Sequence, residues 1–549
     1  MTFLKPTDPA LEHFGHARSR STGHHTDKHR SILRTLSHGS HVAVADVADA
    51  VAEDERATHD FLEELHQQGL IQFTRDESGR IKSAIAGPHL ADRDPSQWSI
   101  DEIHDRERSS YLKTILVLAP AVVIAQVASI LYANWLGQSA FGYFSLIAGT
   151  AMALAYVPHL GMATSLGRFQ TVYQQQNDFS KVRGLIIASS AVTIAISILI
   201  AILALGLAFL DRDAGDDFRA VVLGGVFAGI LGMSQLWGSF LVNLARPAWS
   251  AFPGQLVAPL LSMAVAGIVV AFANSLTTGD LMLVLVGTTL LALFLQWFGM
   301  RGGLPKGFRS SIGVDMADWK TWVKSGPPVL LMSALVILLY RADLYALAIF
   351  KGSDTVAAYS AAITVAEILG NLPSAAYAGA VPFFAPFFAV GRVDLVQYVV
   401  RNYFRLILIP AIVVVVVLLI AAGPILRLYG EGFADARAPL AILLAAQFVS
   451  LAFGPSGYLL IMTGRGRDVS VIYGGQIFLD VALLIVLVPA FDMIGAAFST
   501  LISMIVAQSA MWWWVKRKLH VDSGFWTYFL KRPVIATDPG KAGNTGKTS

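Results

Sequence analysis

The chain contains no cysteine, and only 14% of its 549 residues are charged. The absence of cysteine excludes disulfide bonds, thiolate metal sites and thiol catalysis. The low charge, together with 55% hydrophobic residues and a mean hydropathy of +0.58, is typical of a polytopic membrane protein. No phosphate-binding loop of the G-x-x-x-x-G-K-[ST] type and no nucleophile–base constellation is found. The sequence therefore predicts neither direct ATP drive nor an enzyme.

Charge is divided unevenly along the chain. Residues 1–110 carry 13 Lys and Arg against 19 Asp and Glu, and 11 of the 13 histidines, whereas the remainder has a net charge of +9. The first residues form no apolar core of signal-peptide length, so we expect no cleaved export signal. A polar, acidic N-terminal region is thus followed by a long apolar body.

From Tyr111 onward, apolar runs long enough to cross a bilayer, which takes about 20 helical residues, alternate with short polar breaks. The sequence predicts an all-α polytopic membrane protein with twelve transmembrane helices in two six-helix halves. The predicted spans are 112–136, 141–163, 184–210, 219–245, 250–273, 279–300, 326–350, 355–389, 400–422, 437–463, 468–490 and 493–515.

The loops that follow the even-numbered spans carry roughly 14 Lys and Arg, and those after the odd spans about five. This asymmetry predicts that both termini face the cytoplasm and that the protein lies in the cytoplasmic (inner) membrane.

The two halves read as a repeat. Gly137 opens the segment GQSAFGYFSLIAG after the first span, and Gly352 opens GSDTVAAYSAAIT after the seventh. Arg246 and Arg465 stand at matching ends of spans 4 and 10, 219 residues apart, close to the offset of 216 between the tyrosines of the two segments. Because the offset covers an even number of spans, the halves would run in the same direction, related by an axis along the membrane normal.

These features resemble the polysaccharide (Wzx-type) flippases of the multidrug/oligosaccharidyl-lipid/polysaccharide exporter (MOP) superfamily. The resemblance covers about 111–520. It rests on the six-plus-six repeat, on the phrase RAD…GSDTVAAYS within 341–360, and on 430–467, where a short extracellular turn, a helix and a basic cytoplasmic turn follow one another. It implies two bundles in a V around a central cavity, alternating access, and a lipid-diphosphate-linked sugar as cargo for polysaccharide, lipopolysaccharide or exopolysaccharide export.

Four ionisable residues lie within predicted spans: Arg341, Asp343, Glu367 and Asp480. A charge at the bilayer centre costs about 2.5–3.5 kcal/mol on insertion scales, so each is expected to face a partner or a wet cavity. Arg341 and Asp343 are two residues apart, so their side chains project about 200° apart on a helix and do not face each other.

Two interpretations of these charges stay open. Arg341 would hold a phosphate or acidic sugar of the cargo, while Asp343, Glu367 or Asp480 would take the proton or sodium ion that drives transport. Alternatively, the charges only pair with one another and fix helix register. No metal or organic cofactor is predicted.

Weaker candidates surround these charges. The candidate residues for cargo binding in the cavity are Arg341, Glu367, Asn371, Arg246 and Arg465. Arg246 and Arg465 would form a landing site for diphosphate head groups or, alternatively, are positive-inside anchors. Tyr143 and Tyr359 are expected in the interfacial aromatic belt. The amide side chains that either line the cavity or pair between helices are Gln126, Asn134, Gln235, Asn243, Asn371, Gln447 and Gln476.

The N-terminal region resembles a small winged-helix α+β domain. Helices are expected at 27–39, 42–54 and 55–71, followed by a two-stranded wing with its tip at ESG, 77–79. The third helix is strongly acidic, and binding to DNA phosphates needs a basic surface. We therefore expect a cytoplasmic protein partner for 27–86 and no nucleic acid.

Three functions remain in view: a flippase for lipid-linked glycans, a small-molecule multidrug exporter of the same superfamily, and a membrane-bound sensor that signals through the N-terminal region. The predicted domains are a disordered His-rich tail 1–26, the winged-helix-like domain 27–86, a linker 87–110, two six-helix bundles 111–325 and 326–518, and a cytoplasmic tail 519–549.

Overall fold

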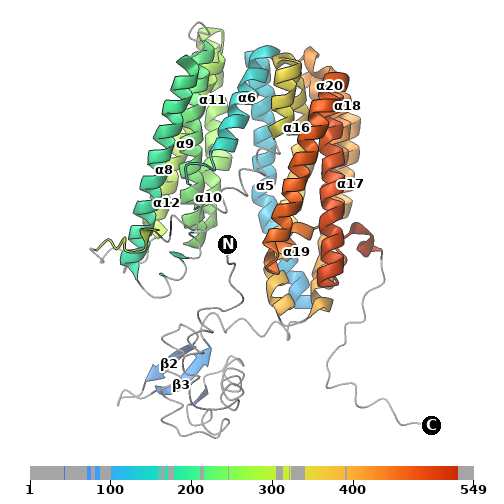
Figure 1. Cartoon of the computed structure of the whole chain (residues 1–549). Helices are drawn as coiled ribbons and strands as arrows, with labels where there is room; N and C mark the ends of the chain where they lie inside the picture. The colour runs from blue at the N-terminus through green and yellow to red at the C-terminus, as the bar shows by residue number, and fades with distance from the viewer. Residues whose placement is uncertain are drawn as a thin grey trace, which may run out of the picture. The chain divides into compact units, whose positions relative to one another are not determined.

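The computed structural model describes residues 42–43, 71–75, 81–86, 100–159, 162, 166, 169–170, 173, 178–209, 216–244, 246–303, 313–320, 322, 341–389 and 392–529. The chain divides into two compact units, Met1–Glu102 and Ile103–Ser549 (Figure 1).

The first unit contains a three-stranded antiparallel sheet of order β1-β3-β2, made of β1 (Val42–Ala43), β2 (Ile71–Arg75) and β3 (Ile81–Ala86). The β2–β3 hairpin confirms the expected wing strands. Val42–Ala43 was predicted to begin a helix, which is wrong, because its backbone pairs with Ser83 and Ala84 of β3. The three predicted helices lie outside the described residues, so the winged-helix fold stays a prediction.

The second unit is helical throughout its described residues. Hydrocarbon offers the backbone no hydrogen-bonding partners, so apolar segments of this length satisfy their N–H and C=O groups within helices. The first half comprises α5 (Ile100–Leu136), α6 (Gln138–Leu154), α8 (Phe179–Ala208), α9 (Asp216–Asn243), α10 (Pro247–Phe252), the π-turn η3 (Pro253–Val257), α11 (Ala258–Ala273) and α12 (Thr278–Gly303). The second half comprises a helical stretch 341–350, α16 (Ser353–Ala389), α17 (Val393–Tyr429), η4 (Glu431–Ala436), α18 (Arg437–Ala452), α19 (Ser456–Met462), α20 (Gly466–Leu519) and η5 (Phe525–Tyr528).

Nine helices within the described residues are long and apolar enough to cross a membrane, which makes this a multi-pass membrane protein. One of them, α20, is interrupted at Asp492, where φ is 58° and ψ is −136°. This break falls at the predicted boundary between 468–490 and 493–515. The second predicted span corresponds to α6, which has only 17 residues, and the seventh is described only from Arg341. Twelve spans therefore remain a prediction.

The turns that begin the two halves of the repeat have the same backbone geometry. Gly137, before α6, and Gly352, before α16, both have positive φ, at 79° and 93°. Glycine adopts this left-handed conformation without steric cost, which explains its use in both turns. The structure thus supports the repeat that these segments predicted.

Helices α6 and α16 form the main helix–helix contact between the halves among the described residues, side by side in Figure 1. A Cβ atom on Gly142 would lie 2.0 Å from the carbonyl oxygen of Ser353, so only glycine permits this approach. The hydroxyls of Ser139 and Ser353 are 2.8 Å apart, and the rings of Phe141 and Phe433 are 5.9 Å apart. The halves are therefore closed against each other at the end predicted to be extracellular.

Helix α5 connects the two halves through its two ends. Near its C-terminal end, the hydroxyl of Tyr132 lies 2.6 Å from that of Ser262 on α11. Near its N-terminal end, Glu107 accepts a hydrogen bond from Asn402 of α17. Helix α5 begins at Ile100, within the predicted linker, and continues into the first predicted span.

Candidate functional site

A central cavity of about 390 Å³ lies between the two halves. Helices α5, α6, α9, α11 and α12 of the first half contribute a wall of apolar and small hydroxyl side chains, including Tyr132 and Ser262. The second half contributes Arg341, Thr364 and Glu367, among others. Of the described residues in this wall, only Arg341 and Glu367 are charged, so the cavity is amphipathic with one charge of each sign.

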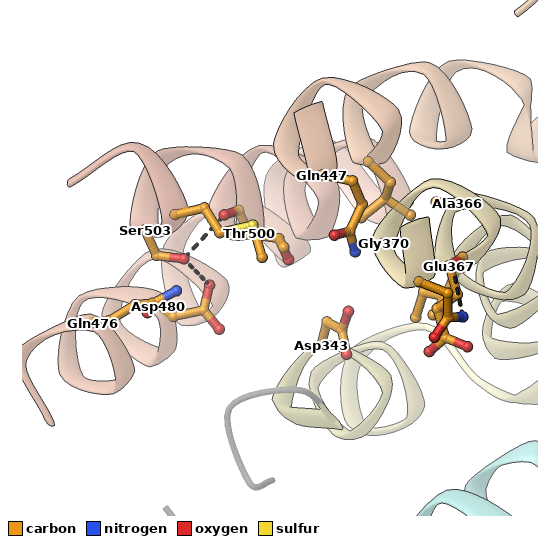
Figure 2. Close-up of a pocket in the computed structure, with 13 residues that line it drawn as sticks. Asp343, Ala366, Glu367, Gly370, Gln447, Gln476, Asp480, Thr500 and Ser503 are labelled. Atoms are coloured by element: carbon orange, nitrogen blue, oxygen red, sulfur yellow. Dashed lines mark hydrogen bonds between the residues drawn. The ribbon is translucent and has the colours of Figure 1, made fainter. Parts of the chain in front are cut away.

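A second, more polar pocket of about 340 Å³ lies within the second half (Figure 2). It is lined by Asp343, Glu367 and Asp480, which come from the stretch 341–350, from α16 and from α20. The structure thus brings together the three carboxylates that the sequence predicted for ion coupling. The polar side chains that complete the lining are Asn371, Gln447, Gln476, Thr500 and Ser503.

Arg341 and Glu367 form an ion pair, with Nη2 and Oε1 4.0 Å apart. The side chain of Glu367 is 47% exposed and that of Arg341 is 23% exposed, so both reach open space. Glu367 lines both the central cavity and the polar pocket, and it therefore stands at the boundary between them. The arginine side chain runs past Gly149 of α6.

Asp343 faces the polar pocket, whereas Arg341 faces the central cavity, as their predicted angular separation requires. Asp343 is buried, and its Oδ1 accepts a hydrogen bond of 2.8 Å from the backbone N–H of Leu344. The fully buried hydroxyl of Tyr359 faces Asp343 and Thr500 without closing a hydrogen bond of good geometry to any described residue.

The prediction that Tyr359 belongs to the interfacial belt is therefore wrong. The sequence held a signal for its burial: the surrounding residues TVAAYSAAITVA are small or apolar on every face of the helix, which is typical of a buried helix. Tyr143 is only partly buried, and it faces a cavity described below.

Asp480 is buried and held by two serines. Its Oδ1 accepts hydrogen bonds from Ser499 at 2.8 Å and Ser503 at 3.0 Å, both located after the break in α20 (Figure 2 shows the bond to Ser503). No sequence motif marks these serines, although their spacing of four places them on one face of a helix.

The other predicted site residues separate into two groups. Asn371 lines the polar pocket and donates to the backbone oxygen of Glu367 at 2.8 Å. Arg246 instead donates to the carbonyls of Gly299 and Gly302 at the end of α12, at 3.2 and 2.7 Å, and Arg465 pairs with Asp468 at 3.7 Å. Neither arginine lines either of these cavities, in contrast to the prediction of a cavity role.

The amide side chains left open by the sequence also divide. Gln447 and Gln476 line the polar pocket with Asn371. Gln126 donates to the carbonyl of Thr364, and Gln235 lies 3.1 Å from the ring of His159, so these two act between helices.

The polar pocket offers carboxylate, amide and hydroxyl oxygens, the groups that bind protons and hard cations. Within the described parts of the chain, no three His, Cys, Asp or Glu residues lie close enough to hold a metal ion.

No protein-family model matches the sequence, and the comparison with curated proteins found no match. Solved structures are similar. An inward-facing multidrug resistance MATE family transporter of the MOP superfamily aligns with a TM-score of 0.58 and 13% identity, over 73% of this chain and 94% of that chain. The lipid II flippase MurJ, in an inward closed conformation, aligns with a TM-score of 0.56 and 10% identity, over 73% and 87%.

A MOP superfamily transporter from Pyrococcus furiosus, whose binding pocket is described as having reverse polarity, aligns with a TM-score of 0.56 and 12% identity, over 78% of this chain and 96% of that chain. At these identities the likeness establishes the fold, which is that of MOP superfamily transporters.

Proposed function

We propose that the protein exports a lipid-linked oligosaccharide or polysaccharide precursor across the cytoplasmic membrane by alternating access, driven by a proton or sodium gradient. The observation that carries this proposal is the Arg341–Glu367 ion pair at the boundary of two cavities. The central cavity lies between the two halves, which would move relative to each other during alternating access. The polar pocket contains the three carboxylates.

The geometry suggests how cargo and ion are coupled. A phosphate entering the central cavity would bind the guanidinium of Arg341, which presents a fork of donors suited to it. Glu367 would then lose its partner and, with Asp343 and Asp480, take up a proton or sodium ion in the polar pocket. Cargo and ion would therefore change each other's affinity by the same factor, as linkage requires.

The second candidate is a small-molecule exporter of the same superfamily. The mostly apolar wall of the central cavity and its balanced charge favour it, because an amphipathic cation would pair with Glu367 as readily as a phosphate would pair with Arg341. The first candidate function requires the cargo to bind Arg341 of the ion pair, whereas the second requires it to bind Glu367.

The test is transport by the purified full chain in proteoliposomes, with a fluorescent lipid-diphosphate sugar and with ethidium. We expect the sugar lipid to be transported, and Arg341→Ala and Asp343→Asn each to reduce its transport by about tenfold or more, the effect of losing one charged hydrogen bond. The control is Arg405→Ala, at an exposed arginine of α17 outside both cavities. Unchanged sugar-lipid transport in both variants would refute the proposal, and transport of ethidium alone would favour the second candidate.

For residues 27–86 we propose docking of a cytoplasmic protein. The acidic sequence supports this, and loss of transport or of partner capture on deletion of 1–100 is the expected result. Tight, salt-sensitive binding of the full chain to DNA, abolished by the same deletion, would instead support the membrane-sensor alternative.

A further inference from the structure

The first half contains a third cavity, a groove of about 380 Å³ that the transport scheme above does not use. It is lined by α6, α8 and α9, and none of its lining residues is charged. Tyr143 and Thr150 supply its only hydroxyls; the rest of the wall is Leu, Ile, Val, Ala and Gly. Such a lining offers almost nothing to a polar ligand and suits a hydrocarbon chain.

The groove runs along α6 from Tyr143, near the predicted extracellular surface, to Leu154 at the C-terminal end of the helix. Leu207 is one residue from the end of α8, and Tyr143 and Val221 are each five residues from the start of their helices, about 8 Å along the axis. Leu203 and Leu207 are 58% and 63% exposed, so the groove opens sideways toward lipid.

Helix α6 is the wall between this groove and the central cavity. Phe144, Ala148 and Met152 face the central cavity, whereas Ile147 and Leu154 face the groove. The two sets recur at helical spacing on opposite sides of one helix. A ligand chain in the groove would therefore lie one helix width from the charged pair in the central cavity.

The groove also borders the seam between the halves. Thr150 lines the groove, and its hydroxyl lies 2.8 Å from the hydroxyl of Tyr345 in the stretch 341–350 of the second half. On the same stretch, Arg341 passes next to Gly149 of α6.

We propose that the groove holds the hydrocarbon chain of the cargo's lipid carrier. The polar head group meanwhile occupies the central cavity, or leaves it between α6 and the stretch 341–350. This inference rests on the proposed function, because only a lipid-linked cargo has such a chain. A head group in the central cavity needs an adjacent path on which its chain stays in an apolar environment. The groove provides that path beside the Thr150–Tyr345 contact.

The experiment uses the full chain in phosphatidylcholine vesicles and, as probe, a polyprenyl monophosphate carrying a diazirine on its chain. Adducts are mapped by mass spectrometry after illumination. We expect saturable labelling of the α8 segment that contains Leu203 and Leu207, which unlabelled polyprenyl phosphate competes away and excess phosphatidylglycerol does not.

The key variant is Leu203→Trp, which fills the groove from an exposed position and should lower this labelling by about tenfold, as bulk placed in a packed space does. The matched control is Ile202→Trp, at a neighbouring residue that is also 58% exposed but does not line the groove. Leu207→Trp is the second test variant, which guards against a folding defect in the first.

The possible outcomes distinguish a failure of the groove proposal from a failure of the proposed function. Saturable labelling that maps elsewhere, or that both groove variants leave unchanged, overturns the groove but keeps a lipid-linked cargo. Equal labelling of all exposed α8 positions, as by bulk lipid, also overturns the groove. No saturable labelling anywhere in the wild-type protein would contradict the proposed cargo and the groove together.

Discussion

Nη2 of Arg341 and Oε1 of Glu367 lie 4.0 Å apart, joining the first helical stretch of the second half to α16. The pair is the only charged element of the described central cavity wall, and its carboxylate also lines the polar pocket. Under the proposed function, a cargo anion that binds the guanidinium of Arg341 would displace this contact.

Asp480→Asn should uncouple transport from the ion gradient. The amide keeps the size of the carboxylate near Ser499 and Ser503 but removes its charge. We expect gradient-driven uptake in proteoliposomes to fall by about tenfold or more, with cargo binding retained. The control Ser503→Ala removes one hydrogen bond, keeps the charge and should have a smaller effect. Normal gradient-driven uptake by Asp480→Asn would exclude the residue from ion coupling.

Gly142→Ala should weaken the closed end of the bundle. The added methyl would meet the carbonyl of Ser353 at 2.0 Å, a clash of the kind that typically costs about 1–3 kcal/mol. The chain has no cysteine, so a single Ser145→Cys reports on accessibility. We expect faster reaction with a membrane-impermeant maleimide added outside. Gly206→Ala is the control, because a Cβ there meets nothing within 4 Å. Equal maleimide reaction rates for both variants would contradict the claim that the contact at Gly142 closes this end of the bundle.

Asn402→Ala should destabilise the attachment of α5 to the second half. Asn402 donates to the buried carboxylate of Glu107, and its amide oxygen lies 3.1 Å from Nδ1 of His104. Loss of the amide leaves buried polar groups unpaired, at a cost of about 1–3 kcal/mol. The measurement is the Tm of the detergent-solubilised protein. Glu107→Gln in the Asn402→Ala background should recover part of the loss; no change in Tm on Asn402→Ala would show that the contact does not stabilise the fold.

Acid should release the C-terminal segment after α20, which lies outside the membrane-spanning helices. Burial alone would raise the pKa of Asp522, but hydrogen bonds from Trp526, Trp512 and the N–H of Gly524, together with Lys516 at 3.5 Å, hold it below its ordinary 3.8. Because the folded pKa is depressed, this stabilisation is complete above 3.8 and is lost as the pH falls through the lower folded value.

The measurement is tryptophan fluorescence and Tm as a function of pH. Asp522→Asn should lower stability by about 1–3 kcal/mol near neutral pH and remove this part of the acid response. Identical acid profiles for the variant and the wild-type protein would show that Asp522 does not hold the segment.

Much of the fold was predictable because it depends on local patterns. Apolar run lengths located the helices, and Gly137 and Gly352 marked turns whose positive φ angles the structure shows. The gap at 490–493 coincides with the break at Asp492. The opposite directions of Arg341 and Asp343 followed from helical geometry alone.

The rest depends on contacts between distant segments, which one sequence does not reveal. Nothing local to Arg246 shows that its guanidinium caps α12, more than 50 residues later in the chain. The serines that hold Asp480 lie beyond a helix break, and the hydroxyl of the buried Tyr359 faces Asp343 and Thr500, which belong to other segments of the second half. The groove between α6 and α8 depends in the same way on how those helices pack.

The most direct test of the central claim compares wild-type protein with Glu367→Gln in proteoliposomes, using a labelled lipid-diphosphate sugar with and without an imposed proton or sodium gradient. The account predicts that the wild-type protein accumulates the sugar lipid only with the gradient. Glu367→Gln should exchange it across the membrane without responding to the gradient, because its cargo site keeps Arg341 while the ion site has lost the one of its three carboxylates that also lines the central cavity. Gradient-driven accumulation by Glu367→Gln at the wild-type rate would contradict the account.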